Sequence, residues 1–315
     1  MNGTYLYDVS IIYVNYKNTT LVVDSVNSLR EKSSGFNYEI IVVDNSNDIN
    51  VINELKSKLE DVIIIDAKGN LGFGKGNNLG VTKARGKYLF FLNTDTLLVN
   101  NAIHELKTYL DNNYECGVVG PNLYTNDLKP NSSFYKYEWN IKTRKKTNSF
   151  FFFIKKHIFK KSVFFNYTDK PVQSKGDTHG AALMIRHELF DEIGGFDKDI
   201  FMYAEETLLC FNVIHRTNYK IYNVPSAKII HLEGASFVGQ SEFQCKSFVD
   251  GNYVYFKKAF GEEYALKYLK EMIKVYKMKL FFAKILRKKE VVDRYINMLN
   301  AYKNKIVYIQ KKEIE

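Results

Sequence analysis

Residues Lys87–Thr96 read KYLFFLNTDT, and this stretch decides the fold. Tyr88–Leu92 are five consecutive apolar or aromatic residues, which is typical of a strand buried on both faces of a parallel sheet. The run stops at four polar residues, NTDT at 93–96, where the strand must end. Ligands of open α/β sheets bind beyond the carboxyl ends of the strands, so Asp95 is well placed to hold a divalent cation and a phosphate bound to it. A strand followed by a structural Asp/Asn turn is the alternative interpretation.

Strands and helices alternate before this stretch. Apolar runs predict strands at 9–14, 38–43 and 62–65, and helical periodicity predicts helices at 19–32, 48–59 and 76–85, the last capped by Gly86. This alternation with short connections predicts an α/β fold with a doubly wound, mostly parallel, Rossmann-like sheet. Asn15 and Asp44 follow the first two strands as Asp95 follows the fourth, so the three strand ends are expected to line one nucleotide-binding crevice.

The glycine-rich turn GNLGFGKG at 69–76 lies between the third strand and the next helix. It has the spacing of a phosphate-binding P-loop up to Lys75, but Gly76 stands where Ser or Thr is needed for magnesium. The dinucleotide pattern G-x-G-x-x-G also fails, at Leu79. The glycines still allow the backbone to approach a ligand closely, and a tight turn without a ligand is the alternative.

Residues 1–240 are expected to form the α/β domain, and 241–315 a C-terminal extension of basic amphipathic helices. Further strands are predicted at 116–120, 180–186, 219–222 and 228–230, and further helices at 103–110, 187–193 and 205–217. An insertion rich in aromatic residues and lysines occupies 122–175. Within it, Phe150–Lys161 reads FFFFIKKHIFKK, which indicates either a loop that contacts the acceptor or an anionic membrane surface, or a buried aromatic cluster.

Composition narrows the class of protein. The formal net charge of +10 is concentrated in the insertion and the C-terminal third, but aromatic and basic residues do not interleave as in single-strand nucleic-acid binders. The three cysteines are too scattered for a zinc site or a disulfide framework. No signal peptide and no run of about 18 apolar residues is found, so a cytoplasmic protein is expected, with peripheral contact at the inner membrane face as an extension of that expectation.

Several short stretches together resemble family 2 glycosyltransferases of the GT-A fold, particularly the branch similar to bacterial rhamnosyltransferases. They occur in the family's order between about residues 9 and 237: VVDNS at 42–46, GNLGFG at 69–74 with NN at 77–78, LNTD at 92–95, GAALMIR at 180–186, GGFD at 194–197, YAEE at 203–206 and HLEGAS at 231–236. The resemblance implies a GT-A-type sheet and an inverting transfer from a nucleotide-diphosphate sugar. Beyond residue 240 it implies little.

Carried over by position, the resemblance implies a nucleotide-sugar site and a metal site. The donor-binding residues would be Asn15, Asp44, Asn45, Asn70, Gly72, Asn78, Asn93, Asp95 and Gly180. Asp95 would also ligate Mg²⁺ or Mn²⁺, with His231 as a further metal or diphosphate contact. The family's Glu-Asp pair reads Glu205-Glu206 here, so Glu206 is the expected base and Glu205 the alternative. Asn93 also departs from the family by replacing the leading Asp of Asp-x-Asp.

The implied function is a hexosyltransferase that uses dTDP-rhamnose or a UDP-sugar and a saccharide or lipid-linked acceptor in cell-surface or capsule polysaccharide synthesis. The main alternative is a non-catalytic nucleotide-sugar-binding homologue that acts as a partner subunit. It is supported by Glu206, which stands where the family has Asp. A nucleotidyltransferase would need a Gly-rich loop after the first strand, where the chain has Asn15-Tyr16-Lys17-Asn18. A processive synthase would need membrane-spanning helices. Self-association is left open.

Overall fold

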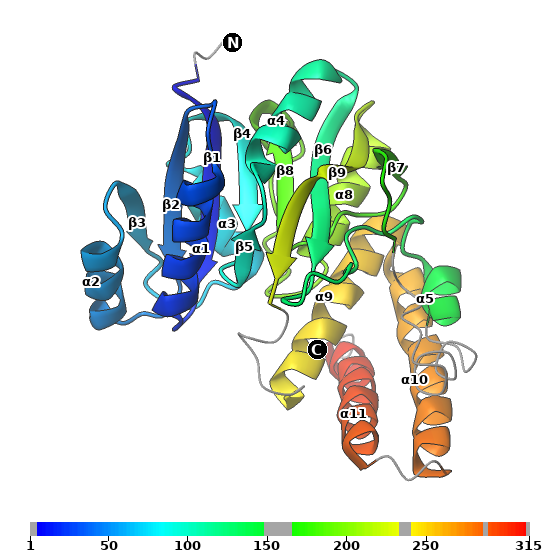
Figure 1. The fold of residues 1–315 in the computed structure, drawn as a ribbon. Coiled ribbons are helices and arrows are strands. Elements are labelled where there is room, and N and C mark those ends of the chain that lie inside the picture. Colours follow the sequence, from blue (N-terminus) through cyan, green and yellow to red (C-terminus); the bar gives the residue numbers. More distant parts are fainter. Residues whose placement is uncertain (1–4, 148–165, 233–240, 286–288, 313–315) are drawn as a thin grey trace. The chain divides into compact units, whose positions relative to one another are not determined.

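The computed structural model describes residues 5–147, 166–232, 241–285 and 289–312. The chain divides into two compact units, which we describe separately (Figure 1). Unit 1 comprises Met1–Tyr137, Phe165–Phe201 and Glu205–Ser236, and unit 2 comprises Glu138–Phe164, Met202–Ala204 and Phe237–Glu315. The Phe150–Lys161 segment lies wholly within 148–165, outside the described residues.

Unit 1 is built on one nine-stranded sheet with the order β3-β2-β1-β4-β8-β6-β9-β5, in which β7 pairs with β9. The strands are β1 (Tyr7–Asn15), β2 (Tyr38–Asp44), β3 (Val62–Asp66), β4 (Gly86–Leu92), β5 (Thr96–Leu98), β6 (Cys116–Tyr124), β7 (Val172–Ser174), β8 (Ala182–Arg186) and β9 (Lys220–His231). The first four strands pair in parallel, as predicted. Beyond them the sheet is mixed, because β8 runs antiparallel between β4 and β6.

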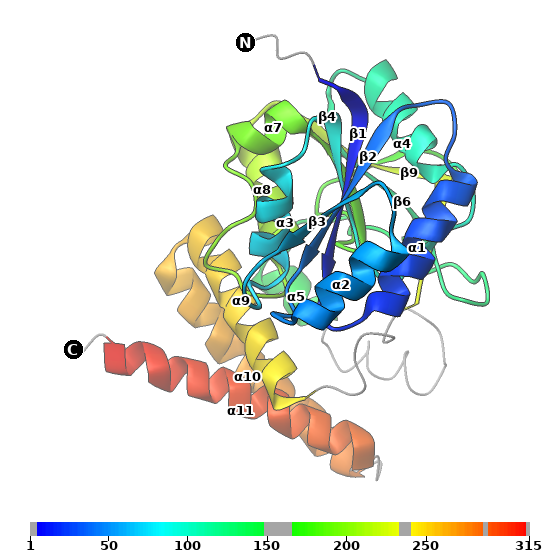
Figure 2. The same ribbon diagram turned by 90° about the vertical axis from the view of Figure 1, so that its left-hand side faces the viewer.

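Helices cover both faces of this sheet, so it is doubly wound. Figure 2 shows α1 (Thr19–Lys32), α2 (Ile49–Lys58) and α4 (Ala102–Asn112) on one side, and α3 (Phe73–Val81), α7 (His187–Glu192) and α8 (Glu205–Arg216) on the other. Alternate residues of each strand point to opposite faces of the sheet and form two apolar layers between the sheet and its helices. Ile11 and Phe90 belong to the layer with Val26 of α1, whereas Ile12 and Phe91 belong to the layer with Leu209 of α8. Both layers are fully buried, which explains the uninterrupted apolar strands in the sequence.

The predicted elements differ from the observed ones in two places that matter for the site. The helix expected at 76–85 is α3, which begins at Phe73 and ends at Val81. Gly86 is therefore not its cap but the first residue of β4, where a Cβ would lie 2.7 Å from Ser10 Oγ. The two strands expected at 219–222 and 228–230 form the single strand β9.

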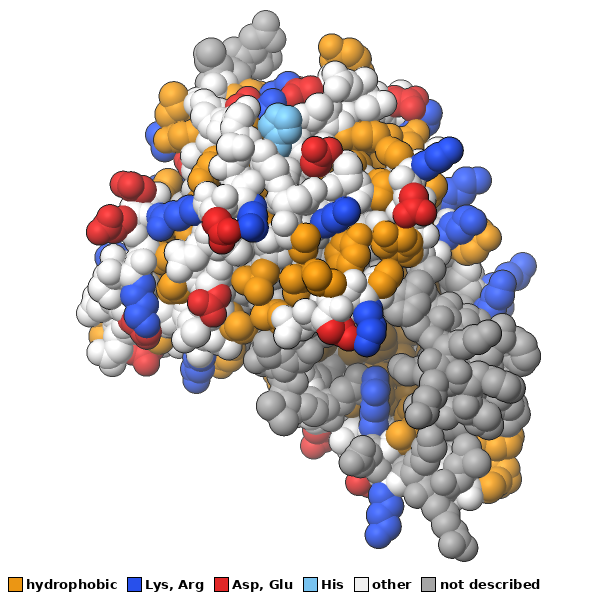
Figure 3. Space-filling model, viewed as in Figure 1, with side chains coloured by type: hydrophobic (Ala, Val, Ile, Leu, Met, Phe, Trp, Pro, Cys, Tyr) orange, Lys and Arg blue, Asp and Glu red, His pale blue; other side chains and the backbone are white. Residues whose placement is uncertain are grey.

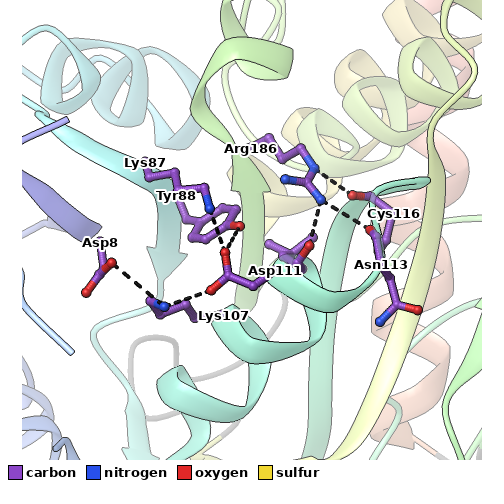
Figure 4. Close-up of polar contacts among 9 residues, drawn as sticks. Asp8, Lys87, Tyr88, Lys107, Asp111, Asn113, Cys116 and Arg186 are labelled. Atoms are coloured by element: carbon purple, nitrogen blue, oxygen red, sulfur yellow. Dashed lines mark hydrogen bonds and ion pairs between the residues drawn. The ribbon is translucent and has the colours of Figure 1, made fainter. Parts of the chain in front are cut away.

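A charged network fixes the amino-terminal edge of the sheet to α4 (Figure 4). Asp111 accepts hydrogen bonds from Lys87 Nζ (2.6 Å), Tyr88 Oη (2.7 Å) and Lys107 Nζ (2.7 Å). Burial alone would raise the pKa of Asp111, but these three donors outweigh it and hold the pKa well below its usual value. Arg186, at the end of β8, donates to the backbone carbonyls of Leu110, Asn113 and Cys116. These contacts are structural and lie at the opposite strand ends from the predicted site.

Unit 2 is helical, with α5 (Ile141–Thr147), α9 (Glu242–Phe260), α10 (Glu262–Ile285) and α11 (Lys289–Lys312). A capping box between Ser241 and Gln244 begins α9. The core is aromatic: Tyr268 and Tyr302 are buried with their hydroxyl oxygens 2.9 Å apart. Among the described helices, none is both long and apolar enough to cross a membrane.

Candidate active site

The first strand ends form a buried hydrogen-bonded corner. Asp44 Oδ1 accepts from Asn15 Nδ2 (2.7 Å) and from Ser46 Oγ (2.9 Å), and Asp44 Oδ2 accepts from the Ser46 N–H (3.1 Å). Asn15 and Asp44 are paired residues of parallel β1 and β2, which explains why residues 29 positions apart meet. The exposed fraction of Asp44 is 0%. The predicted residues are therefore brought together, and Asp44 holds the turn in shape rather than facing solvent.

The glycine-rich turn packs directly onto this corner. Asn45 Nδ2 donates to the Gly72 carbonyl oxygen (3.0 Å), and Asn70 Oδ1 accepts from the Gly72 N–H (3.0 Å). Gly72 has φ of 80°, and a Cβ there would collide with the Phe201 backbone, so only glycine fits. Asn45 Oδ1 is buried and has no hydrogen-bond partner among the described residues, which leaves one acceptor for a ligand in this corner.

Asn78 ties the same turn to the segment that leads to α8. Its amide donates to the Phe196 carbonyl oxygen (2.8 Å) and accepts from the Phe196 N–H (3.0 Å). The Phe73 N–H donates to the Phe201 carbonyl oxygen (3.2 Å). The predicted donor residue Asn78 thus joins two backbone segments and fixes their spacing.

Asp95 and His231 form the second part of the site. Asp95 precedes β5, which pairs antiparallel with the end of β9, so the Leu232 N–H reaches the Asp95 carbonyl oxygen (2.9 Å). His231 Nε2 lies 3.4 Å from Asp95 Oδ1, and the two residues are 8% and 6% exposed. Burial would raise the pKa of Asp95, but the neighbouring His231 imidazole outweighs it and lowers the pKa. Asp95 is therefore an ionised carboxylate in a largely enclosed position.

These two side chains fit a divalent cation. Two ligands on adjacent corners of an octahedral shell lie about 3 Å apart, close to the separation of Asp95 Oδ1 and His231 Nε2. His231 Nδ1 is buried without a hydrogen-bond partner among the described residues. The described part of the chain contains no cluster of three or more acidic, His or Cys side chains with metal-binding geometry. A cation held here would take its remaining oxygens from phosphate and water, as Mg²⁺ commonly does.

His179 is a site residue that the sequence did not indicate. Its ring meets the His231 ring edge-to-face, with centroids 5.3 Å apart. The Ala181 N–H donates to His179 Nδ1 (3.1 Å), so the neutral ring carries its proton on Nε2. Burial, and next the neighbouring His231, lower the pKa of His179 and keep it neutral. His179 is thus a hydrogen-bond donor through Nε2 and is not set up as a metal ligand.

Glu205 and Glu206 begin α8 and have different surroundings. Glu205 is 2% exposed and packs on α3, where its Cγ lies 3.2 Å from the Cβ position of Gly74. Glu206 is half-buried, and its Cδ and Oε1 lie 3.2 and 3.5 Å from the Cβ position of Gly180. Glycine at 180, the residue after His179, therefore makes room for the Glu206 carboxylate.

The backbone before these carboxylates is strained. Tyr203 and Ala204 both have positive φ values, 71° and 73°, although neither is glycine. Each such residue costs about 1–3 kcal/mol and persists only where its surroundings hold it in place. Within unit 2, Gly251 of α9 packs so closely that a Cβ would lie 2.8 Å from the Met202 carbonyl oxygen.

The predicted residues therefore fall into two neighbouring groups. Asn15, Asp44, Asn45, Asn70, Gly72 and Asn78 surround the glycine-rich turn, and Asn93, Asp95, Gly180, Glu206 and His231 surround the end of β4. The Asn93 N–H donates to the Ala181 carbonyl oxygen (2.9 Å), which joins β4 to the entry of β8. Glu205 is the exception, because it points into the packing between α8 and α3.

Comparison with known proteins gives the class. Residues 10–194 match the model of the family described as "Glycosyl transferase family 2". The chain belongs to this family of glycosyltransferases.

Two curated proteins and one crystal structure illustrate the relationship. The chain is 28% identical over 235 residues to the low-salt glycan biosynthesis hexosyltransferase Agl10 of Haloferax volcanii, covering 72% of this chain and 68% of that protein. It is 27% identical over 156 residues to the uncharacterized glycosyltransferase MJ1057 of Methanocaldococcus jannaschii, covering 48% and 52%. The crystal structure of GalNAc-T7 with UDP, GalNAc and Mn²⁺ matches 97% of this chain and 57% of its own, with a TM-score of 0.60 and 15% identity.

The structural likeness concerns the fold, and it confirms the predicted GT-A-type sheet with C-terminal helices. This chain spans only about half the length of MJ1057 and of the GalNAc-T7 chain. The rhamnosyltransferase branch stays a prediction.

Proposed function

We propose that this glycosyltransferase is a metal-dependent, inverting hexosyltransferase that moves a sugar from a nucleoside diphosphate donor to an acceptor hydroxyl. The observation that carries the proposal is the placement of an ionised carboxylate, Asp95, beside His231, together with a second carboxylate, Glu206, beside Gly180 at the start of α8. This reaction needs a cation that neutralises the leaving diphosphate and a carboxylate that takes up the acceptor proton, and the two sets of side chains would supply them.

The donor's nucleotide would bind at the glycine-rich turn. Asn45 offers a buried acceptor oxygen, and the half-buried Asn93 stands at the end of β4. Asn15, Asp44 and Asn70 would act by holding the turn, since their side chains already bond to it or to one another. Asn78 and Gly72 would fix the turn against Phe196 and Phe201. In this proposal Asn45 and Asn93 contact the nucleotide directly, and the other predicted donor residues of the turn act by keeping it in shape.

Asp95 and His231 would hold Mg²⁺ or Mn²⁺. When bound, such an ion neutralises negative charge on the diphosphate as it departs. The GalNAc-T7 crystal structure, which contains Mn²⁺ and UDP, supports this choice for a related fold. His179 would donate a hydrogen bond through Nε2 toward the same anionic group.

Glu206 would act as the general base. The acceptor oxygen attacks the anomeric carbon from the face opposite the diphosphate, the bond from that carbon to the diphosphate oxygen breaks, and the acceptor proton moves to the Glu206 carboxylate. We choose Glu206 because Glu205 is buried against α3, whereas Glu206 is half-buried and stands beside Gly180, the residue that follows His179 in the chain. Its length, one methylene more than the family's Asp, is accommodated by the missing side chain at Gly180.

The proposed pathway is the synthesis of a cell-surface glycan, with dTDP-rhamnose or a UDP-sugar as donor and a saccharide or lipid-linked saccharide as acceptor. The name of the Haloferax hexosyltransferase, which refers to glycan biosynthesis, supports the first part. Three buried, free cysteines fit a reducing compartment such as the cytoplasm.

The test is a donor screen followed by turnover measurements. The full chain with Mg²⁺ or Mn²⁺ is mixed with a panel of thymidine and uridine diphosphate sugars, and thermal shift identifies the donor that stabilises it. Release of nucleoside diphosphate with saccharide acceptors, blocked by chelation, is the expected result. Donor binding without turnover for any acceptor would favour the non-catalytic homologue instead.

A further inference from the structure

The second half of α10 exposes lysines and large apolar side chains together. Every charged residue between 272 and 285 is a lysine. The exposed side chains of this half-helix are three lysines and three large apolar residues: Lys274, Lys277, Lys284, Met278, Phe281 and Ile285. Phe281 and Ile285 are 62% and 59% exposed. We call these six residues the α10 face.

Helix geometry places all six on one side. At about 100° per residue, their positions span a sector of about 120° around the helix axis. The opposite side of the same helix packs inward, through Met272, Val275 and Ala283. Ala283 belongs to a small core with Tyr295 of α11. The α10 face is therefore not needed to hold the helices of unit 2 together.

Lysines and apolar side chains on one helix face favour an anionic surface that also has an apolar interior. Single exposed apolar residues are ordinary, but three on one stripe between lysines form the pattern of a helix that lies in a membrane interface. Residues 241–315 hold 17 Lys and Arg against 9 Asp and Glu, a net +8 of the chain's +10. By contrast, side chains of both signs are interspersed over the face of unit 1 seen in Figure 3.

Other partners fit less well. A symmetric dimer through the α10 face would bring lysines against the same lysines of a second copy. A nucleic acid would attract the lysines but would leave Phe281 and Ile285 in water. An anionic lipid surface satisfies both kinds of side chain, because lysines extend to the headgroups while apolar side chains enter the acyl boundary.

We propose that the α10 face docks on an anionic lipid surface. Phe281, Ile285 and Met278 enter the headgroup region, and Lys277 and Lys284 contact lipid phosphates. This docking goes beyond sugar transfer and requires neither donor nor turnover. It would hold the enzyme where a lipid-linked acceptor is presented.

The experiment is co-sedimentation of the full chain with vesicles of phosphatidylcholine alone or with about one third phosphatidylglycerol. We expect binding to the anionic vesicles only, weakened at about 1 M salt because lipid charge is then screened. Phe281→Ser/Ile285→Ser should lower the partition constant at least about tenfold. The matched control is Val307→Ser/Tyr308→Ser on α11, where the replaced side chains are 49% and 55% exposed.

The charge arm uses Lys277→Gln/Lys284→Gln, which should lower binding about five-fold for each lysine removed; Lys274 is left unchanged because its Nζ pairs with Glu271 at 2.7 Å. Its control, Lys303→Gln/Lys311→Gln, changes two exposed lysines of α11 and should have a much smaller effect. Circular dichroism checks that each variant keeps its fold.

Three results would overturn the proposal. One is the absence of vesicle binding by the unchanged chain at about 0.15 M salt. Another is binding that the α10 variants and the α11 controls weaken equally. The third is a chain that runs as a dimer in light scattering and becomes a monomer with Phe281→Ser/Ile285→Ser, since the face would then join two copies.

Discussion

Glu206→Gln keeps the length and shape of the side chain and removes only its ability to accept a proton. A positioned general base contributes typically about 10²–10⁴-fold to the rate, so we expect kcat to fall by that factor, equivalent to about 2.7–5.4 kcal/mol in the barrier. Donor affinity should change little, because the proposed donor contacts lie at the glycine-rich turn and at Asp95.

Two further variants would displace the Glu206 carboxylate by different distances without removing it. Glu206→Asp withdraws the carboxylate by one methylene, about 1.5 Å, and a displacement of about 1 Å can cost about 10²-fold in rate. Gly180→Ala places a methyl carbon 3.2 Å from Glu206 Cδ, so the carboxylate must shift by a fraction of an ångström. We expect a loss near 10²-fold for the first variant and a smaller loss, of about two- to ten-fold, for the second.

The assay is nucleoside diphosphate release at saturating donor, with donor affinity measured separately by calorimetry. Glu205→Gln is the matched control: Glu205 is buried against α3, so its replacement should alter thermal stability and leave most of the turnover. The reasoning would be refuted if Glu206→Gln kept more than about a tenth of the turnover, or if Glu205→Gln abolished turnover in a protein that still bound donor.

Three further outcomes follow from the contacts described above. Asp95→Asn should abolish the dependence of donor binding on Mn²⁺, seen by calorimetry with and without the ion; an unchanged Mn²⁺ dependence would exclude Asp95 as a ligand. His179→Phe should weaken donor binding about ten-fold through loss of one hydrogen bond to an anion, with the fold intact by circular dichroism; equal affinity would exclude that contact. Asp111→Asn should destabilise unit 1 by about 1–3 kcal/mol at pH 7 in urea unfolding. Because folding lowers the pKa of Asp111 far below that of a free carboxyl group, its contribution is complete above about pH 5, declines below about pH 4 and is lost only as pH falls through the lowered pKa; a penalty that stayed the same between about pH 5 and pH 2, or an equal penalty for the exposed Asp127→Asn, would contradict the assignment.

Much of the fold follows from local patterns in the sequence. The buried parallel strands are continuous apolar runs, so their positions could be predicted to within a residue or two. The start of α3 could not, because glycines at 74 and 76 have low helix propensity and are needed instead for close packing on Glu205 and Val14. Pro225 interrupts the pattern of β9, and the structure absorbs it as a bulge, since Val224 and Lys228 pair with successive residues of β6.

In the candidate site, too, local patterns could be predicted from the sequence, whereas features that depend on tertiary contacts could not. Polar residues at strand ends could be recognised because parallel strands end at one edge of the sheet. The difference between Glu205 and Glu206 could not, since it depends on which neighbouring glycine each side chain meets. His179 was missed because its contact with His231 joins residues far apart in the chain and exists only after β8 and β9 enter the same sheet.

The strained residues Tyr203 and Ala204 have a consequence for the evolution of this enzyme. Glycine would adopt their positive φ without steric cost, so Ala204→Gly should relieve conformational strain. The same change would let the peptide before α8 sample other conformations, and the position of the Glu206 carboxylate would then be less well defined. Selection for heat resistance and selection for turnover would then favour different residues at 204, and the thermal stability and turnover of Ala204→Gly would measure that trade-off.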